Sequence, residues 1–404
     1  EEDVVIVGAG VAGLATALGL HRQGIRSLVL ESSDQLRITG FGLGMWKNAW
    51  KAMEALGIAT TLRQQHHSIQ HMSFISVDTG AQVYSIHDLA KIGGNDYELR
   101  SVNRKLLLET MANELPEGTI RFSSKVVGIQ NDAHFKYLLL LAGGTRLKTK
   151  VLIGSDGVNS IVAKLLGFKK PVSTGRYAVR GAIHYDDKHE LGTTFIHLLG
   201  KGVRFGIVPS NDHFIYWFFT YIPSSQGTIL LIHIKKDMEH DHAKLKQFLL
   251  EKLANAPEKQ RRVFADTELG NMYCTELKYR HPWDLLWGNI YRGNACVIGD
   301  ALHPMTPDVG QGACIALEDA VVLARCIGEA MKTRGYDEGR LRNGLKRFAG
   351  ERRWRSITLI SLSYFSGVVN QGRGSVMSFL RDKFLAGLIM LATFRLSTYD
   401  SGKL

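Results

Sequence analysis

Residues 4–20 read VVIVGAGVAGLATALGL, an apolar run followed by a glycine-rich turn and a second apolar segment. The run predicts a buried strand, and the second segment predicts a helix. Between them, Gly8, Gly10 and Gly13 have the GxGxxG spacing. The first glycine permits the turn, the second lets a pyrophosphate approach the backbone, and the third lets the helix pack closely on the strand. A purely structural glycine turn is the alternative interpretation of this motif taken alone.

The next segment completes a strand-helix-strand unit. Gly24 is a candidate helix C-cap, and Ser27–Leu30 predicts a second strand. Glu31 ends that strand, where such a unit presents a carboxylate to the ribose of an adenosine. Arg37 is a further candidate for the same ligand. Strand, motif, helix, strand and terminal acid in this order predict a dinucleotide-binding fold.

Residues 295–312 form a second informative stretch, ACVIGDALHPMTPDVGQG. It predicts a buried strand, a loop with two prolines and the start of a helix. Asp300 can accept hydrogen bonds from the sugar hydroxyls of a ligand. A glycine-rich helix start offers unpaired N–H groups, which suit a ligand with an electron-poor ring that becomes negative on reduction. A tight turn between a strand and a helix is the alternative. The candidate residues beside the ring are Pro304, Pro307, Gly310, Gln311 and Gly312.

Two further segments add candidate residues. Residues 151–160 read VLIGSDGVNS, in which Asp156 and Gly157 turn the chain after a buried strand. Arg104 lies near the start of a helix predicted over residues 101–115, and a guanidinium suits bidentate binding of a phosphate. An ordinary Asp-Gly turn and a surface arginine are the alternatives.

These four segments resemble the class A FAD-dependent monooxygenases, the para-hydroxybenzoate hydroxylase and salicylate hydroxylase group, and especially the plant monooxygenase branch. The resemblance extends from Val4 to about Arg355. It implies tightly bound FAD, because a nicotinamide dehydrogenase would usually need only the first motif. The residues that it assigns to FAD are Gly8, Gly10, Gly13, Glu31, Arg37, Arg104, Asp156, Gly157, Asp300, Gly310 and Gly312.

The chain departs from the family pattern at two places. Asn103 stands where the family more often has histidine, and Ala163-Lys164 stands where many relatives carry an arginine. The second departure leaves nicotinamide binding, and the choice between NADPH and NADH, open.

The resemblance implies an α/β fold with a Rossmann-like FAD-binding domain of the para-hydroxybenzoate hydroxylase type, a second, mainly antiparallel β substrate domain and C-terminal helices. We expect a discontinuous FAD domain over residues 1–70, 100–169 and 286–355. The substrate domain would comprise residues 71–99 and 170–285, and residues 356–404 a C-terminal helical segment. Within these, we expect helices over residues 45–56, 242–253, 313–332 and 338–355.

Composition is that of one large globular enzyme. The chain has 404 residues, of which 45% are hydrophobic, enough for two packed domains. Four cysteines without CxxC spacing predict a reducing intracellular compartment, cytoplasmic or organellar, and no metal site. The net charge of +12 is scattered without a basic-aromatic block, so nucleic acid is not an expected partner. We expect a monomer or a homodimer, and the missing initial Met leaves a targeting segment open.

The longest apolar run, residues 384–394, is shorter than the roughly twenty residues that a transmembrane helix needs. Arg381, Lys383 and Arg395 flank it. It predicts a buried C-terminal helix, with peripheral membrane contact as the alternative.

The chemistry that the resemblance implies has two parts. NADPH or NADH reduces the flavin, and O2 then adds to its C4a carbon to give a hydroperoxide that transfers oxygen to a small, aromatic or phenolic substrate. The protein supplies binding, orientation and a dry pocket. Candidate bases are His197, His213 and Tyr216, whereas we expect His303 to be positional. The candidate substrate residues are Arg180, Phe205, Tyr216 and Trp217.

Two alternatives remain beside the hydroxylase. The first is a flavin-dependent epoxidase or oxidase of a lipophilic isoprenoid at a membrane, which the apolar run supports. The second is a flavin-binding protein that lacks oxygenase activity and acts through protein partners, which Ala163 supports.

Overall fold

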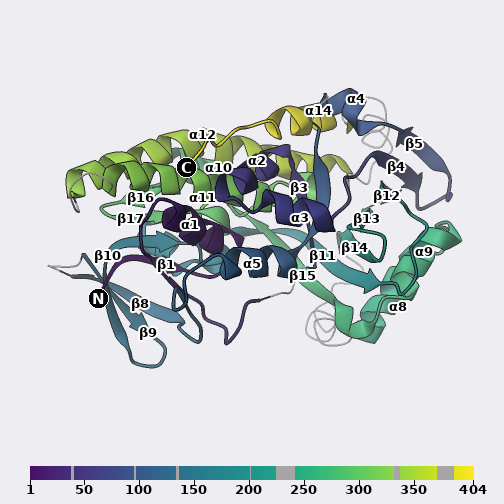
Figure 1. Cartoon of the computed structure of the whole chain (residues 1–404). Helices are drawn as coiled ribbons and strands as arrows, with labels where there is room; N and C mark the ends of the chain where they lie inside the picture. The colour runs from purple at the N-terminus through teal and green to yellow at the C-terminus, as the bar shows by residue number, and fades with distance from the viewer. Residues whose placement is uncertain are drawn as a thin grey trace.

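Two large sheets, joined by a small one and flanked by helices, form the described part of the molecule (Figure 1). The computed structural model describes residues 1–37, 41–94, 97–132, 136–200, 202–223, 242–331, 337–370 and 386–404. One large sheet has eight described strands, the other has seven, and the small sheet pairs β3 (Gly42–Trp46) with β6 (Leu99–Asn103). The predicted α/β fold is confirmed.

The eight-stranded sheet contains the strands that the sequence motifs follow. Its main path runs β16-β17-β10-β1-β2-β7, and an antiparallel β8-β9 hairpin extends it beside β10. Strands β17, β10, β1, β2 and β7 are parallel to one another. Their bounds are β1 Glu2–Val7, β2 Leu28–Leu30, β7 Ile120–Arg121, β8 Val126–Asp132, β9 Lys136–Leu141, β10 Arg146–Gly154, β16 Tyr291–Arg292 and β17 Ala295–Val297.

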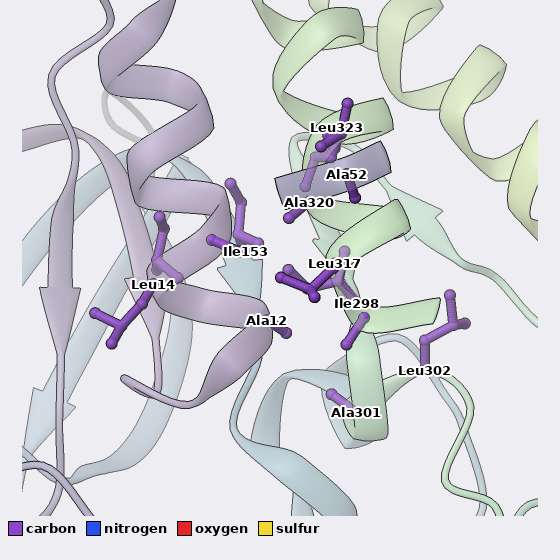
Figure 2. Packing of buried hydrophobic residues seen from close by; sticks show 14 of the residues in the cluster. Ala12, Leu14, Ala52, Ile153, Ile298, Ala301, Leu302, Leu317, Ala320 and Leu323 are labelled. Carbon is purple, nitrogen blue, oxygen red and sulfur yellow. The ribbon is translucent and has the colours of Figure 1, made fainter. Parts of the chain in front are cut away.

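Two helices pack together against this sheet, α1 (Val11–Arg22) and α11 (Gly312–Met331). Figure 2 shows Ala12 of α1 beside Ala301 and Leu317, all in one apolar core. Gly19 allows the two helices to approach closely, because a Cβ there would lie 2.8 Å from the Ala324 Cβ. The GxGxxG helix and the helix after the second motif are therefore direct neighbours.

The seven-stranded sheet has the order β15-β11-β14-β13-β12-β4-β5 and is antiparallel except between β12 and β4. Its strands come only from residues 71–86 and 172–279, segments that we expect in the substrate domain. Helices α8 (His242–Lys252) and α9 (Glu258–Ala265) cover one of its faces. The strand bounds are β4 His71–Ser76, β5 Gln82–Ile86, β11 Val172–His184, β12 Thr194–Gly200, β13 Val203–Pro209, β14 Phe214–Tyr221 and β15 Met272–Tyr279.

Three expected helix boundaries are wrong. Met45 and Trp46 belong to strand β3, so helix α2 begins at Lys47. Residues 99–103 form strand β6, and helix α5 begins at Arg104, where the Asn103 side chain accepts from the Lys105 N–H at 2.9 Å. Helix α12 (Glu338–Asn370) continues through Arg355 without a break, because Arg352 and Arg355 are buried there against Glu318. The other described helices are α2 Lys47–Leu56, α3 Ala59–Gln65, α4 Leu89–Gly93, α5 Arg104–Asn113, α6 Ile161–Leu165, α10 Pro282–Trp287 and α14 Ala386–Leu396.

The C-terminal apolar run falls partly in helix α14, which lies beside α12 along one edge of the molecule (Figure 1). Phe394 is buried, whereas Leu388 and Leu391 are exposed. Arg381 and Lys383 lie outside the described residues. Among the helices that the structure describes, none is both long enough and apolar enough to span a bilayer.

Candidate FAD site

The four motif strands end at one level of the sheet. Val7 at the end of β1 lies in register with Gly154 of β10 and Leu30 of β2, and Gly154 lies in register with Val297 of β17. The glycine turn, Glu31, Asp156 and Asp300 follow these strand ends, so they emerge at one edge of the sheet. Ligands of open parallel sheets bind at the carboxyl ends of the strands.

The glycine turn is closely packed at Gly8 and Gly13 and open at Gly10. Gly8 has φ +102°, and a Cβ on Gly13 would lie 1.9 Å from the Gly8 carbonyl oxygen. A Cβ on Gly10 would meet nothing within 4 Å. Helix α1 begins there without a side-chain cap, so its N-terminus can receive an anion.

Glu31 is held against this turn. Its carboxylate accepts from the Ala9 N–H and the Ser33 N–H, both at 2.9 Å, and Arg37 lies 3.5 Å away. Burial raises the pKa of Glu31, but these hydrogen bonds and Arg37 lower it more, so the net pKa lies below the usual range. The carboxylate is therefore ionised and fixed where an adenosine ribose would lie.

Asp156 holds its own loop rather than facing outward. Its carboxylate accepts from the Ser160 hydroxyl at 2.5 Å and from the Ile161 N–H at 2.7 Å, at the start of α6. Gly157 (φ +77°) is open, because a Cβ there would meet nothing within 4 Å. Backbone at Gly157, rather than the Asp156 carboxylate, is the part of this loop that a cofactor could approach.

Residues 299–312, which we call the ring loop, are anchored at their start by Asp319 of α11. Asp319 accepts from the Gly299 N–H at 2.9 Å and lies 2.6 Å from His303 Nε2. His303 is fully buried, which agrees with a positional role. Gly299 is also close to the first motif, since a Cβ there would lie 2.8 Å from the Ala12 Cβ. The two motifs of the predicted cofactor site are thus in direct contact.

Arg280 holds the middle of the ring loop. Its guanidinium donates to the carbonyl oxygens of Leu302 at 2.9 Å and Ala301 at 3.1 Å, and its own N–H donates to the Pro304 carbonyl at 3.0 Å. Burial lowers the pKa of Arg280 to about 10, so the side chain remains a cation at neutral pH. Sequence reasoning did not identify this residue.

The end of the ring loop is tied to the seven-stranded sheet. Asp308 is buried and accepts two hydrogen bonds from Arg176 of β11, at 2.8 and 3.1 Å. Arg204 of β13 donates to the Asp308 carbonyl at 3.1 Å. The Ser363 hydroxyl of α12 donates to the Thr306 carbonyl. These contacts connect the loop beside the expected ring with the sheet expected to bind substrate.

A buried ionic network lies behind the ring loop. Arg352 of α12 donates to Asp319 at 2.7 Å and to Glu318 at 2.6 Å. Asn48 of α2 donates to Glu318 at 2.5 Å and to Gln311 Oε1 at 2.9 Å. Gln311 is fully buried, and its side chain faces this network. Its predicted place beside the ring therefore applies to its backbone and not to its side chain.

Asp300, Arg104 and Arg180 gather at the junction of the two sheets. Asp300 is exposed and the two arginines are half-buried, yet surrounding protein raises the pKa of Asp300 and lowers the pKa of Arg104. Arg180 interacts with the hydroxyls of Tyr216 and Tyr273. Two candidate FAD residues, Asp300 and Arg104, therefore lie close to one candidate substrate residue, Arg180.

Burial gives no support to the predicted substrate contacts of Phe205 and Trp217. Both are fully buried in the second core, where Phe264 of α9 contacts their rings at 5.5 and 4.9 Å. Side chains alternate between the faces of a strand, so Tyr216 points to the opposite face from Trp217. A fully buried side chain offers no surface to a substrate.

The three candidate bases lie in different environments. His197 is buried and stacked on Phe74 at 4.7 Å, and burial with the nearby Arg204 holds its pKa well below the usual range. His213 lies near the start of β14, where its Nδ1 is 3.1 Å from the Tyr185 carbonyl oxygen. Burial raises the pKa of Tyr216 to about 12 despite the opposing effect of Arg180. Tyr216 therefore stays protonated and can donate a hydrogen bond.

The residues present fit an FAD molecule. Glycines that leave room for a ligand occur in the first motif, the Asp156 loop, β3 and the ring loop: Gly10, Gly157 and Gly44 have no neighbour within 4 Å of an added Cβ, and Gly312 has one at 4.0 Å. A family model described as an FAD binding domain matches residues 1–352. The chain belongs to this FAD-binding family.

Proteins that resemble the chain over nearly its whole length are monooxygenases. Monooxygenase 2 of Arabidopsis thaliana is 46% identical and covers 100% of this chain and 98% of its own, and Monooxygenase 1 is 33% identical over 100% of both. An FAD-dependent urate hydroxylase of Mycolicibacterium vanbaalenii is 30% identical over 79% of this chain and 78% of its own. The predicted resemblance to class A FAD-dependent monooxygenases and their plant branch is confirmed.

A solved structure shows the same fold. The Klebsiella pneumoniae protein HpxO, complexed with FAD and uric acid, superposes with a TM-score of 0.82 at 22% identity and covers 98% of this chain and 97% of its own. At that identity the likeness concerns the fold alone. FAD binding and membership of an oxidoreductase family stand on the family match and on the plant relatives.

Residues that sequence reasoning missed are mostly those that hold the ring loop. They are Asn48, Arg176, Arg204, Arg280, Asp308, Glu318, Asp319 and Arg352. One signal was available, because Glu318-Asp319 is an acidic pair inside the apolar run of residues 312–324 and such a pair needs buried partners. The partners themselves lie far away along the chain, so their identity depends on the fold.

Proposed function

We propose that the protein is a monooxygenase that uses FAD, NADPH or NADH, and O2 to insert one oxygen atom into a small aromatic or phenolic substrate. The observation that carries this proposal is the cluster of Arg180, Tyr216 and Tyr273 beside Asp300 and Arg104. It combines hydrogen-bond donors, a cation and aromatic surface at the place where the expected cofactor residues meet the second sheet.

FAD, when bound, accepts electrons from NAD(P)H and then activates O2. The protein's own part is to hold a preorganised environment. Asp319, Arg280 and Asp308 fasten the ring loop at its start, middle and end. The N-terminus of α11 follows directly after this loop, and its positive end would stabilise a flavin ring that becomes anionic on reduction.

The substrate would bind through acceptor groups. Arg180 is a cation and Tyr216 is a protonated hydroxyl, so both favour a phenolate, carbonyl or carboxylate oxygen. His197 stays neutral and buried, which disfavours it as a base. The name of the Mycolicibacterium relative, a urate hydroxylase, supports a planar, electron-rich ring as the substrate class.

The test is turnover of a phenol panel by the FAD-loaded enzyme. We expect substrate-stimulated NADPH or NADH oxidation and incorporation of labelled oxygen from O2 into the product. Arg180→Gln should raise KM for anionic substrates by roughly tenfold, because a hydrogen bond to a charged group contributes about 1.5–3 kcal/mol. Arg262→Gln, on the surface of α9, is the matched control with unchanged KM.

One outcome would overturn the proposal. A yellow protein that NADPH reduces, but that forms no oxygenated product from phenols or isoprenoids, would support a flavin-binding protein without oxygenase activity. Ala163 was the basis of that alternative, and it is buried in α6 with its N–H donated to Ser160.

A lipophilic isoprenoid is the second candidate substrate. The exposed Leu388 and Leu391 on α14 favour it, because they offer apolar surface beside the helix that packs on the ring loop. Oxygenated product from an isoprenoid, formed only when lipid vesicles are present, would select this candidate over the phenol.

A further inference from the structure

Exposed apolar side chains gather on three C-terminal helices. Helix α12 lies between α10 and α14, and both contact it. The large apolar residues of these helices that are 40% to 76% exposed are Trp283, Trp287, Trp354, Tyr364, Phe365, Val368, Leu388 and Leu391. Monomeric proteins rarely leave such a group of large apolar side chains together in water.

The two neighbours lie on opposite sides of α12. On one side, Arg353 donates to the Gly288 carbonyl at the end of α10 at 2.9 Å, and the Tyr364 ring stacks on Tyr279 at 4.7 Å. On the other side, Leu362 and Val369 pack with Ile389 of α14. With 100° per residue, residues 353 and 364 share one side of the helix and residues 362 and 369 share nearly the opposite one.

The strip between these two sides faces solvent. It contains Trp354, Thr358, Ser361, Phe365 and Val368, which are all exposed and all uncharged. It is about 21 Å long at 1.5 Å per residue. An ordinary surface helix carries charged residues on its outer face, so this strip is unusual. We call the strip, with the exposed tryptophans of α10 and leucines of α14, the aromatic face.

Cations border the aromatic face. Lys346, about two turns before Trp354 on α12, is exposed, and so is Arg395 on α14. Lys169 and Lys170 are exposed beside the end of α10, where Phe168 contacts Gly288. The acidic residue of α10, Asp284, is half-buried.

We propose that the aromatic face docks on a membrane surface that carries anionic headgroups. Tryptophan with a rim of lysine and arginine is the composition of bilayer-interface segments, whereas lysine is depleted in protein–protein interfaces. The net charge of +12 attracts an anionic surface and repels a second copy of the chain. The helices would lie on the membrane and not cross it.

Docking there would bring lipid near the candidate site. The inner side of α12 contacts the ring loop, through the Ser363 hydroxyl and the Thr306 carbonyl. The membrane contact does not depend on the proposed function, because the docking surface involves none of the residues assigned to FAD or substrate.

The test is cosedimentation of the FAD-loaded full chain with vesicles. We expect binding to phosphatidylcholine vesicles that contain phosphatidylserine, weak binding to phosphatidylcholine alone, and a decrease with added salt. The triple variant Trp283→Ser, Trp287→Ser, Trp354→Ser should bind at least tenfold more weakly. Lys169→Gln and Lys170→Gln should each weaken binding to the anionic vesicles about fivefold and reduce the salt dependence.

Matched controls separate docking from damage to the fold. Val83→Gln on β5 and Val127→Gln on β8 remove exposed valines elsewhere and should leave vesicle binding unchanged. The tryptophan variant should keep its FAD content and melting temperature, because the replaced side chains are mostly exposed.

Three results would overturn the proposal. The first is no binding to phosphatidylserine vesicles at low salt, and the second is equal binding by the tryptophan variant. The third is a dimer in analytical ultracentrifugation that the same tryptophan substitutions dissociate, since this would assign the aromatic face to a second copy of the chain.

Discussion

Asp300 is the acidic residue that follows strand β17 in the second motif. It is exposed and close enough to Arg104 to interact with it electrostatically. We expect Asp300→Ala to lose FAD or to bind it loosely, because the hydroxyl acceptor is gone. The flavin absorbance per protein after gel filtration measures this. Asp300→Asn should retain part of the FAD, whereas full occupancy in Asp300→Ala would contradict the assignment.

Asp308 is expected to contribute to the stability of the fold. Its side chain is 1% exposed and holds two arginines, so Asp308→Asn leaves buried cations without their carboxylate. We expect a loss of about 3–5 kcal/mol in the free energy of unfolding, measured with urea. The control is Lys188→Ala, which removes an exposed ion pair with Asp212 and should leave the unfolding midpoint nearly unchanged. An equal effect of both substitutions would refute the role given to Asp308.

Helix α1 and the glycine turn before it contribute both to folding and to FAD binding. Gly10→Ala adds a methyl group into open space, so the apoprotein should keep its stability while FAD binds at least tenfold more weakly. Gly13→Ala puts its methyl group 1.9 Å from the Gly8 carbonyl oxygen, so the turn must shift and the apoprotein should melt earlier. Melting temperature of the apoprotein and an FAD titration separate the two effects. If Gly10→Ala destabilised the apoprotein as much as Gly13→Ala, the distinction would fail.

Local patterns predicted the motif elements correctly, and two of the wrong helix boundaries have a clear physical reason. The strand β6 pairs with β3, a partner that is distant in the chain, so residues 99–103 carry no local signal of it. Helix α12 passes Arg355 because its polar residues there face Glu318 inside the protein and so do not mark an end. In both cases a long-range contact decides the local structure.

The buried carboxylates of α11 make the stability of the whole molecule depend on pH. Burial raises the pKa values of Glu318 and Asp319, but Arg352 and their other partners lower them further, so both lie below the usual range. A lowered folded pKa contributes stability above the unfolded value, about pH 4, and this stability is lost as the pH falls through the folded pKa. Urea unfolding should therefore give a steady free energy from neutral pH to about pH 5 and a decline below about pH 4. A protein that became more stable on acidification would contradict this sign.

For the candidate site as a whole, the sequence predicted the motif residues but not the side chains that hold them. Gly8, Glu31 and Asp300 follow strand ends that are recognisable from local apolar runs. Arg280 and Arg176 reach the ring loop from the second sheet, and nothing local distinguishes them from surface arginines. Phe205 and Tyr216 have equally aromatic surroundings in sequence, yet strand alternation and sheet packing place them on opposite faces.

The sequence determines the dinucleotide fold and the family, because the glycine spacing, the acidic residues after the strands and the apolar periodicity are all local features of the chain. Only the tertiary structure decides which charged side chains fasten the ring loop, which aromatic residues lie on which face of the second sheet, and that Trp283 and Trp354 belong to one exposed surface. Those properties depend on the register of strands and the packing of helices that are distant along the chain, and a buried ion pair is stable only where the fold brings both partners together.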